Sequence, residues 1–338
     1  MRKTLTLLFF FGLFSMVLMG CSSKVNQVSE LPKIPALFVP LPGNPTPQNI
    51  NYELKSMPQL PNRAMVYKFI QPNITESSVA ELAQKLKIYG EIKYEPRHGV
   101  YSIRDGSKLL WVETKTGKWS YQNQSKAYKA GENDSLNLPS DEQAKVIAIQ
   151  QIQDLGLPVD EFKVADVTKF TEEGAPGKPV KTLSKAVFLY RQIDNKSILG
   201  VSRIIILIGD NGEVAGVSKY YKETQPYNCY PLKPFEKAFD ELKNGRASNN
   251  ISGKANHAII KNVELRYWED AGPISDQPFL QPVYLFEGET TIDGKTETFD
   301  AIVPAIEGSS VEPPVQNDNT PKPPKVTDFE ISRRGGFQ

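Results

Sequence analysis

Apolar residues recur at helical spacing in three places along the chain, and each such stretch is followed by short segments that alternate apolar and polar residues. The first helix is predicted over 75–89, where Thr75 is the expected N-cap. A second helix is predicted to begin after Ser140, which caps it. A third is predicted over 234–242. The pattern therefore indicates three helices, each leading into strands.

The alternating segments predict antiparallel strands, because successive side chains of a strand point to opposite faces of a sheet. The predicted strands are 64–70, 91–95, 100–104, 109–113, 119–123, 162–169, 186–192, 201–208, 213–221, 259–267, 281–290 and 296–304. Asp210, Asn211 and Gly212 form a hairpin turn signal, since these residues tolerate positive φ.

One helix followed by several strands, three times over, predicts an α+β fold made of repeated units of a helix plus an antiparallel sheet. We place unit one at 63–135, unit two at 136–230 and unit three at 231–307. Each helix can cover one face of the strands that follow it.

The segments on either side of these units are rich in proline. Eight prolines lie between residues 22 and 62, and closely spaced prolines favour extended, semi-rigid chain. We expect residues 21–62 to form a disordered Pro-rich tether. Residues 308–338 are polar and again Pro-rich, so we expect a disordered tail there.

The first residues have the pattern of an export signal. Arg2 and Lys3 precede an apolar run over 4–17, which is too short to span a bilayer comfortably. The run ends before Gly20 and Cys21. This ending resembles the bacterial lipobox, which implies that 1–20 is a lipoprotein signal peptide and that Cys21 carries diacylglycerol. The alternative is an ordinary signal peptide or an uncleaved anchor.

The lipobox resemblance implies a place for the protein. The mature chain would be held on the extracytoplasmic face of a cell membrane by the lipid on Cys21, since two or more acyl chains anchor stably. The membrane is thus the first expected partner.

Charge and composition exclude several classes of function. Loss of Arg2 and Lys3 with the signal takes the basic count from 40 to 38 against 39 acidic residues. Without a basic excess we expect no nucleic acid partner. A hydrophobic fraction of 39% is typical of a globular protein.

The chain contains two cysteines and two histidines. If Cys21 carries lipid, Cys229 forms no intramolecular disulfide in the mature chain. A nucleophilic Cys229 would need a basic partner, and His98 and His257 are distant in sequence. Zinc needs three or four converging ligands, so we expect neither a metal nor another cofactor.

Units two and three resemble known extracytoplasmic domains. The second and third units are similar to PepSY-type domains, and the residues that carry this resemblance are the DEQA sequence at 141–144 and the segment 205–220. The third resembles the YycH/YycI group of exported regulators in PFEKA at 234–238, VELRY at 263–267 and LQPVY at 280–284. The resemblance implies a module without catalytic activity that binds an envelope protein, such as a protease or a sensor kinase.

An alternative is an envelope hydrolase that uses a pair of carboxylates. The candidates are Glu264 and Glu269, which flank an aromatic pair, and Glu287 and Glu289, which flank a glycine. The alternative, that they are solvated positions of alternating strands, is favoured. A small-ligand carrier is disfavoured, because the chain lacks the alternating βα pattern of two-lobed binding proteins.

Aromatic residues crowd the link between units two and three and the end of a later strand. Aromatic side chains are enriched at protein interfaces. The predicted binding surface consists of Tyr220, Tyr221, Tyr227, Tyr230, Tyr267 and Trp268. The alternative is that these side chains belong to the core.

Overall fold

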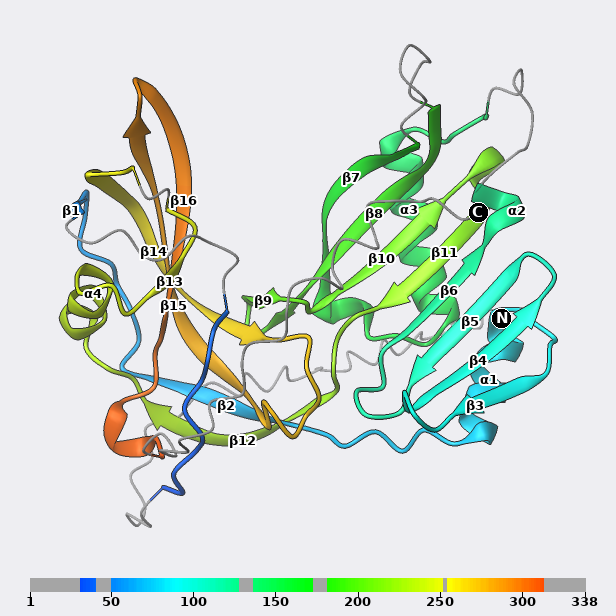
Figure 1. Cartoon of the computed structure of the whole chain (residues 1–338), viewed down its shortest axis with the longest axis horizontal. Coiled ribbons are helices and arrows are strands. Elements are labelled where there is room, and N and C mark those ends of the chain that lie inside the picture. The colour runs from blue at the N-terminus through cyan, green and yellow to red at the C-terminus, as the bar shows by residue number, and fades with distance from the viewer. Residues whose placement is uncertain (1–30, 41–49, 128–135, 173–180, 252–253, 313–338) are drawn as a thin grey trace, which may run out of the picture.

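The computed structural model describes residues 31–40, 50–127, 136–172, 181–251 and 254–312. These residues form an α+β fold in which a mixed network of strands carries α-helices on its faces (Figure 1). Figure 1 shows two lobes, which meet near its centre. We call the lobe on the right of that view the large lobe and the one on the left the small lobe.

The large lobe is an antiparallel sheet with the strand order β7-β8-β10-β11-β6-β5-β4-β3. Its strands are β3 (Ile92–Glu95), β4 (Val100–Asp105), β5 (Lys108–Glu113), β6 (Trp119–Asn123), β7 (Phe162–Glu172), β8 (Lys181–Ile193), β10 (Arg203–Ile208) and β11 (Val214–Lys219). Asn211 has a φ of 54° between β10 and β11, so the predicted turn at this position is confirmed.

Two long helices of the large lobe begin at the residues that the sequence indicates. Helix α1 (Glu76–Lys85) has Thr75 as its N-cap, and α3 (Asp141–Asp154) has Ser140. Each cap side chain accepts a hydrogen bond from the backbone three residues later, and a side chain at that position bonds back. A single turn, α2 (Gln124–Ala127), follows β6, and a short 3₁₀ turn, η1 (Val159–Glu161), precedes β7.

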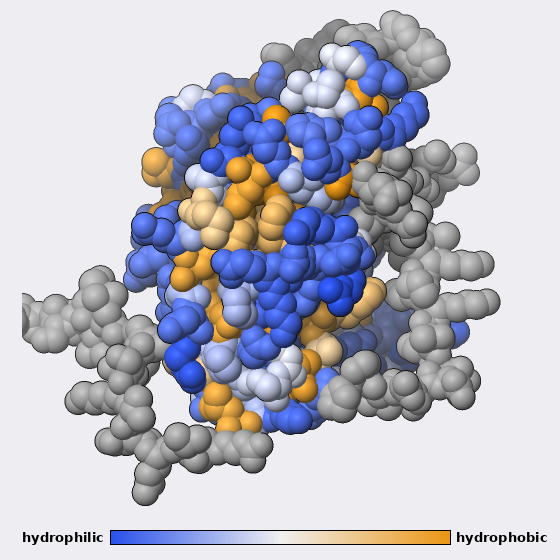
Figure 2. All heavy atoms as spheres, turned by 90° about the vertical axis from the view of Figure 1, so that its left-hand side faces the viewer, coloured by the Kyte–Doolittle hydropathy of each residue, from blue (hydrophilic) through white to orange (hydrophobic). Residues whose placement is uncertain are grey.

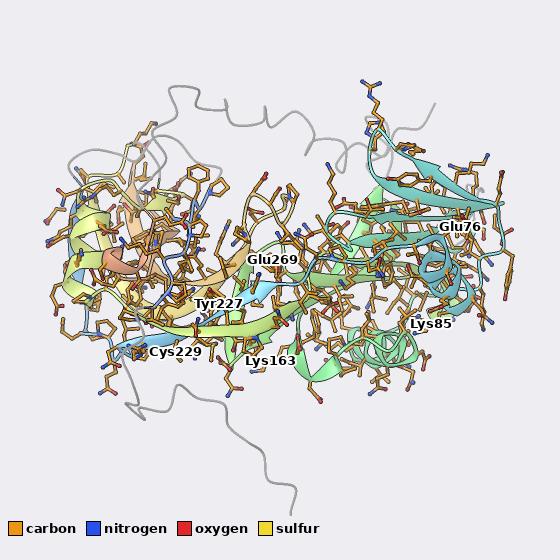
Figure 3. All side chains as sticks on the ribbon, turned by 90° about the horizontal axis from the view of Figure 1, so that it is seen from below. Glu76, Lys85, Lys163, Tyr227, Cys229 and Glu269 are labelled. Atoms are coloured by element: carbon orange, nitrogen blue, oxygen red, sulfur yellow. The ribbon has the colours of Figure 1, made fainter. Side chains whose placement is uncertain are left out.

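Helices α1 and α3 pack on the same face of this sheet. Val79 and Ala83 of α1 and Ala148 and Ile152 of α3 belong to one buried cluster, together with Ile206 of β10. Figure 3 shows both helices on one side of the strands. The core of the large lobe therefore lies between the sheet and its two helices.

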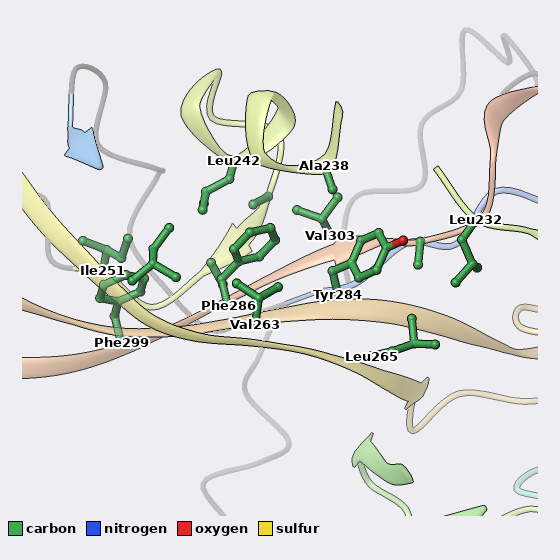
Figure 4. Packing of buried hydrophobic residues seen from close by; sticks show 14 of the residues in the cluster. Leu232, Ala238, Leu242, Ile251, Val263, Leu265, Tyr284, Phe286, Phe299 and Val303 are labelled. Carbon is green, nitrogen blue, oxygen red and sulfur yellow. The ribbon is translucent and has the colours of Figure 1, made fainter. Parts of the chain in front are cut away.

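The small lobe is built on three long strands and a helix. The strands are β14 (His257–Glu269), β15 (Phe279–Ile292) and β16 (Lys295–Pro304), joined by β1 (Asn51–Leu54), β2 (Arg63–Phe69), β12 (Thr224–Pro231) and β13 (Ser248–Asn249). Helix α4 (Phe235–Lys243) packs Ala238 and Leu242 against Phe286 and Val303 (Figure 4).

A short strand joins the two lobes. β9 (Lys196–Gly200) pairs antiparallel with β8 of the large lobe and parallel with β14 of the small lobe. Gly200 is required here, because a Cβ would lie 2.0 Å from the carbonyl oxygen of Glu269.

The strands of predicted units one and two share one sheet, since β6 pairs with β11. The strand that was predicted to open unit one lies elsewhere. β2 pairs with β12 and β15 in the small lobe, so its partners are more than a hundred residues away in sequence. The sequence pattern also missed β1, β9, β12 and β13.

The predicted disordered tether is wrong for residues 31–40 and 50–62. Ile34 is fully buried, and Val39 is 5% exposed. Proline has no amide donor, but the carbonyl oxygens of Pro32 and Pro35 each accept a hydrogen bond. The apolar side chains of Leu37 and Val39 pack on the small lobe. The remaining residues of the predicted signal and tether, 1–30 and 41–49, lie outside the described residues.

The predicted disordered tail is wrong for residues 308–312. Gly308–Ser310 form a 3₁₀ turn, η3, and Val311 pairs with Ile34. Residues 313–338 lie outside the described residues.

The outer side of the small lobe, seen in Figure 2, carries hydrophilic residues interspersed with smaller apolar areas. None of the helices in the described part of the chain has the length and apolar character that a membrane span needs.

Candidate functional site

A group of buried charged side chains lies where the two lobes meet. We call it the junction cluster, and it consists of Lys118, Arg191, Lys219, Lys222 and Glu269. None of the five is more than 5% exposed. Glu269 ends β14 and lies between the lobes in Figure 3. Charged groups are seldom enclosed unless protein partners bond to them.

Glu269 is the only buried acid of the junction cluster. Its Oε1 accepts a hydrogen bond from the backbone amide of Lys222 over 2.8 Å. Burial raises the pKa of the carboxyl, while the charge of Lys222 and the nearby Ser202 hydroxyl oppose that rise. The second oxygen, Oε2, has no hydrogen-bond partner among the described residues.

Two ammonium groups bind the loop that follows Glu269. Nζ of Lys222 donates to the carbonyl oxygens of Asp270 (3.1 Å) and Gly272 (3.0 Å), and Nζ of Lys118 donates to that of Ala271 (2.8 Å). Lys118 comes from the large lobe, so this loop ties the lobes together. Burial and the charge of Lys222 lower the pKa of Lys118.

Arg191 and Lys219 complete the cluster around Tyr221. Arg191 donates to Glu161 through Nε at 2.7 Å and to the carbonyl oxygen of Lys222 through Nη1 at 2.9 Å. Nζ of Lys219 lies 3.9 Å from the centre of the Tyr221 ring. Burial lowers the pKa of Lys219.

These contacts give the junction cluster a structural role. Its charged groups are enclosed and contact backbone groups, a ring or the nearby carboxylates of Glu161, Glu223 and Asp270, so they present no open surface to a substrate. The cluster links the end of β14 with β8, β11 and the residue before β6, and it fixes how the lobes meet. The sequence signal for it was weak, since lysines within strands usually face solvent.

Most of the predicted aromatic surface is buried, which contradicts that prediction. Tyr221, Tyr230 and Tyr267 are 0% exposed and Trp268 is 7% exposed. Tyr220 and Tyr227 are half-buried. The structure therefore favours the alternative, that these side chains are core.

Five of the six aromatics also lie in four different core clusters: Tyr221 in one, Tyr227 and Tyr230 in a second, Tyr267 in a third and Trp268 in a fourth. The Tyr230 hydroxyl donates to the carbonyl oxygen of Pro32, and the Tyr267 hydroxyl donates to that of Met65. Trp268 packs under residues 31–40. Such a hydroxyl lets the tyrosine ring lie in a core while its polar end still forms a hydrogen bond.

The candidate carboxylates do not converge as a group. The side-chain amide of Asn262 donates to both Glu264 and Glu287, at 2.8 Å each. Glu289 pairs with Lys261, and Glu269 is enclosed in the junction cluster. Glu264 and Glu287 are thus near each other, on a sheet surface.

Cys229 and the histidines lie apart. Cys229 is disulfide-bonded. The disulfide contradicts the expectation that Cys229 forms none. His98 is exposed, and His257 lies 3.7 Å from Glu53. Within the described ranges, no three His, Cys, Asp or Glu side chains form a metal-binding group.

A shallow groove of about 620 Å³ lies at the start of α3. It is lined by Leu138, Val146 and Ile147 on one side and by Asn211 and Gly212 on the other. The polar side chains of Asn137, Glu142 and Gln143 also line it, and each is already hydrogen-bonded within the protein.

The face of the large sheet opposite α1 and α3 carries a row of large apolar side chains. We call it the open face, and it consists of Leu109, Trp111, Phe188, Ile205 and Leu207. Their neighbours in sequence belong to the buried cluster under the helices, so these five point the other way. All five are half-buried, and no core cluster of the described residues includes them.

Strand register places these side chains side by side. Ile205 lies opposite Phe188 on one side and Ser218 on the other. Ser218 in turn lies opposite Ser120, and Ser120 opposite Trp111. The row therefore crosses five strands, and no described helix or strand packs over it. Figure 1 shows the face towards the viewer, with α1 and α3 behind.

Small polar groups within the open face are bonded to one another. The hydroxyls of Ser120 and Ser218 lie 2.7 Å apart. At the end near the junction, the Arg203 guanidinium lies 5.7 Å from the centre of the Tyr220 ring. The sequence predicted these strands but gave no sign of which face would lack a covering helix.

Comparison with known proteins does not indicate a function for this chain. No family model matches the chain, and no curated protein matches it. A solved structure of an uncharacterized protein from Eubacterium rectale ATCC 33656 is similar, with a TM-score of 0.41 and 12% sequence identity. The match covers 77% of this chain and 90% of that one. A likeness at this level supports no argument about function.

Proposed function

We propose that this chain is a lipid-anchored extracytoplasmic binding protein without catalytic activity. It modulates an envelope protein, such as a protease or a sensor kinase, which it contacts through the open face. The lipobox pattern at Cys21 and the PepSY- and YycI-like stretches support this proposal. Cys21 itself lies outside the described residues.

The observation that carries the proposal is the open face. A row of half-buried apolar side chains on a sheet face that no described helix covers is a candidate site of contact with another protein. Phe188, Ile205 and Leu207 lie on adjacent strands with Trp111 at the other end of the row. Burial of such side chains contributes about 25 cal/mol per Å² of apolar surface.

The partner that fits this face is a protein with an apolar contact surface. The hydroxyls between the apolar side chains are already bonded, so they offer little to a sugar. Large apolar and aromatic side chains at the centre of a patch are typical of protein interface hot spots. The polar residues Arg104 and Gln122 are exposed at one end of the face and suit the rim of such an interface.

The test compares two matched substitutions. Ile205→Glu places a charge on the open face, and Val146→Glu places one on an exposed position of α3, which is 70% exposed. Each variant and the wild-type lipoprotein are crosslinked in native membranes and purified. A specific partner that is lost with Ile205→Glu and retained with Val146→Glu supports the proposal, provided that both variants unfold cooperatively.

Two results would count against it. Retention of every partner by Ile205→Glu would exclude the open face. Alternatively, removal of residues 313–338 could create binding that the full chain lacks. In that case the chain's own C-terminal segment occupies the face, and the partner assignment is wrong.

A further inference from the structure

Residues 31–40 are fastened to the small lobe along their whole length, and we call them the strap. Ile34 donates its amide to the carbonyl oxygen of Ser310 over 3.1 Å, and its own carbonyl accepts from Glu312 over 2.8 Å. The carbonyl oxygen of Pro32 accepts from the Tyr230 hydroxyl over 2.6 Å. These bonds hold the beginning of the strap.

The second half of the strap covers a sheet face. Leu37 and Val39 pack against Trp268, Val283 and Leu285 on the side of the sheet away from α4. Nε2 of Gln281 donates to the carbonyl oxygen of Pro35 over 2.9 Å, and the Ser248 hydroxyl donates to that of Val39. The strap is therefore part of the folded body.

The strap leaves little chain between the lipid site and the body. Nine residues, 22–30, separate Cys21 from Leu31. A fully extended chain spans at most about 3.5 Å per residue, so Leu31 can lie no more than about 35 Å from the lipid-bearing residue. A tether that ran to residue 62 would have allowed about four times that distance.

We infer that the small lobe stands at the membrane surface, with the end that carries Pro32, Ile34 and Val311 turned towards the bilayer. The inference rests on the lipid anchor in the proposed function. This end of the small lobe contacts the lipid surface. The strap enters at the lower end of the small lobe in Figure 1, whereas the large lobe extends on the other side of the molecule. The open face belongs to the large lobe, so it is held away from the anchored end of the small lobe.

This geometry narrows the kind of partner. A protein that contacts the open face must have its contact surface within reach of a body held by a short chain. An extracytoplasmic domain attached to the same membrane meets this condition. A partner that stands far from the membrane does not.

The test uses the full mature lipoprotein in vesicles of phosphatidylethanolamine and phosphatidylglycerol that contain an acceptor-labelled lipid. A donor fluorophore is attached through an unnatural amino acid at position 33, which is exposed at the start of the strap, or at position 89 on the large lobe, where Tyr89 is 74% exposed. Energy transfer should be several times more efficient from position 33.

A second variant carries a Gly/Ser linker of about thirty residues inserted after Glu30, which adds roughly 30 Å of mean span. Transfer from position 33 should then fall to the level seen at position 89. Equal transfer from both positions without the linker, or no loss on insertion, would overturn the inference.

Vesicle sedimentation separates this inference from the anchor itself. Wild type should sediment with vesicles and Cys21→Ser should not. If both stay in solution, the lipid anchor is wrong and the inference falls with it. If wild type sediments but the two labels transfer equally, the anchor stands and only the orientation is wrong.

Discussion

Lys222 binds both the side chain of Glu269 and the loop that follows it, at the junction of the lobes. The amide of Lys222 donates to Oε1 of Glu269 over 2.8 Å, while the Lys222 ammonium binds carbonyl oxygens of the loop that follows Glu269. Both residues are 0% exposed. Because the junction cluster encloses four cations and one acid, the charge of Glu269 offsets a repulsion that water cannot screen.

Glu269→Gln should therefore destabilise the protein strongly. The amide keeps the shape and the hydrogen bond from Lys222 but removes the negative charge. Removal of one partner from a buried charged pair costs about 3–5 kcal/mol. Urea denaturation of both proteins measures the loss. Glu264→Gln is the matched control on the same strand, and because Glu264 is partly exposed it should cost less than about 1 kcal/mol.

The loss of stability caused by Glu269→Gln should be smaller at alkaline pH than at neutral pH. The pKa values of Lys118 and Lys219 are lowered from 10.5, and Glu269 opposes that lowering. Without the charge of Glu269 the pKa values of Lys118 and Lys219 in the folded protein fall further. Below pH 10.5 these two lysines then bind more protons in the unfolded chain than in the folded one, so the stability of the variant rises with pH more than that of the wild type. Denaturation at neutral pH and near pH 10 checks this. A pH-independent difference would contradict the charge argument.

Ile34→Ala tests whether the strap belongs to the folded body. Ile34 is 0% exposed among residues of the small-lobe core, so its truncation should cost about 2–5 kcal/mol. Phe38→Ala, in the same segment, removes a side chain that is 76% exposed and should change stability by less than about 0.5 kcal/mol. If both changes are equally neutral in urea denaturation, the strap does not stabilise the fold.

Local chemistry made some elements of this fold predictable. Thr75 and Ser140 begin their helices because each has a partner three residues later that completes a capping box. The turn at Asn211 needs positive φ, which the residue type permits. Such features depend on a few neighbouring residues, so a sequence pattern contains them.

Pairing between distant strands was not predictable in the same way. β2 reads as the first strand of unit one, but its partners β12 and β15 follow much later in the chain. The strap has apolar residues between prolines, a pattern that favours a tether because prolines cannot join a ladder. Lys222 and Glu269 meet only because the lobes meet, and no spacing of residues marks that contact.

Ser140→Ala should cost about 1 kcal/mol, because Ser140 accepts from the Gln143 amide at the start of α3. Val146→Ala on the same helix is the control. Val146 is 70% exposed, and alanine is the better helix former, so stability should be unchanged or slightly higher. Thermal unfolding followed by circular dichroism measures both. Equal effects would mean that the cap contributes nothing.

Gly288→Ala should be among the most damaging single changes in the small lobe. A Cβ at this position would lie 2.3 Å from the carbonyl oxygen of Ile259 and 2.6 Å from the Phe299 ring. Backbone on one side and a buried ring on the other leave no easy relaxation, so the cost should reach about 3 kcal/mol or more. Gly308→Ala is the matched control, since a Cβ there meets nothing within 4 Å. Urea denaturation of the two variants should differ by most of that amount, and similar midpoints would show that β14 and β15 can separate to admit a methyl group.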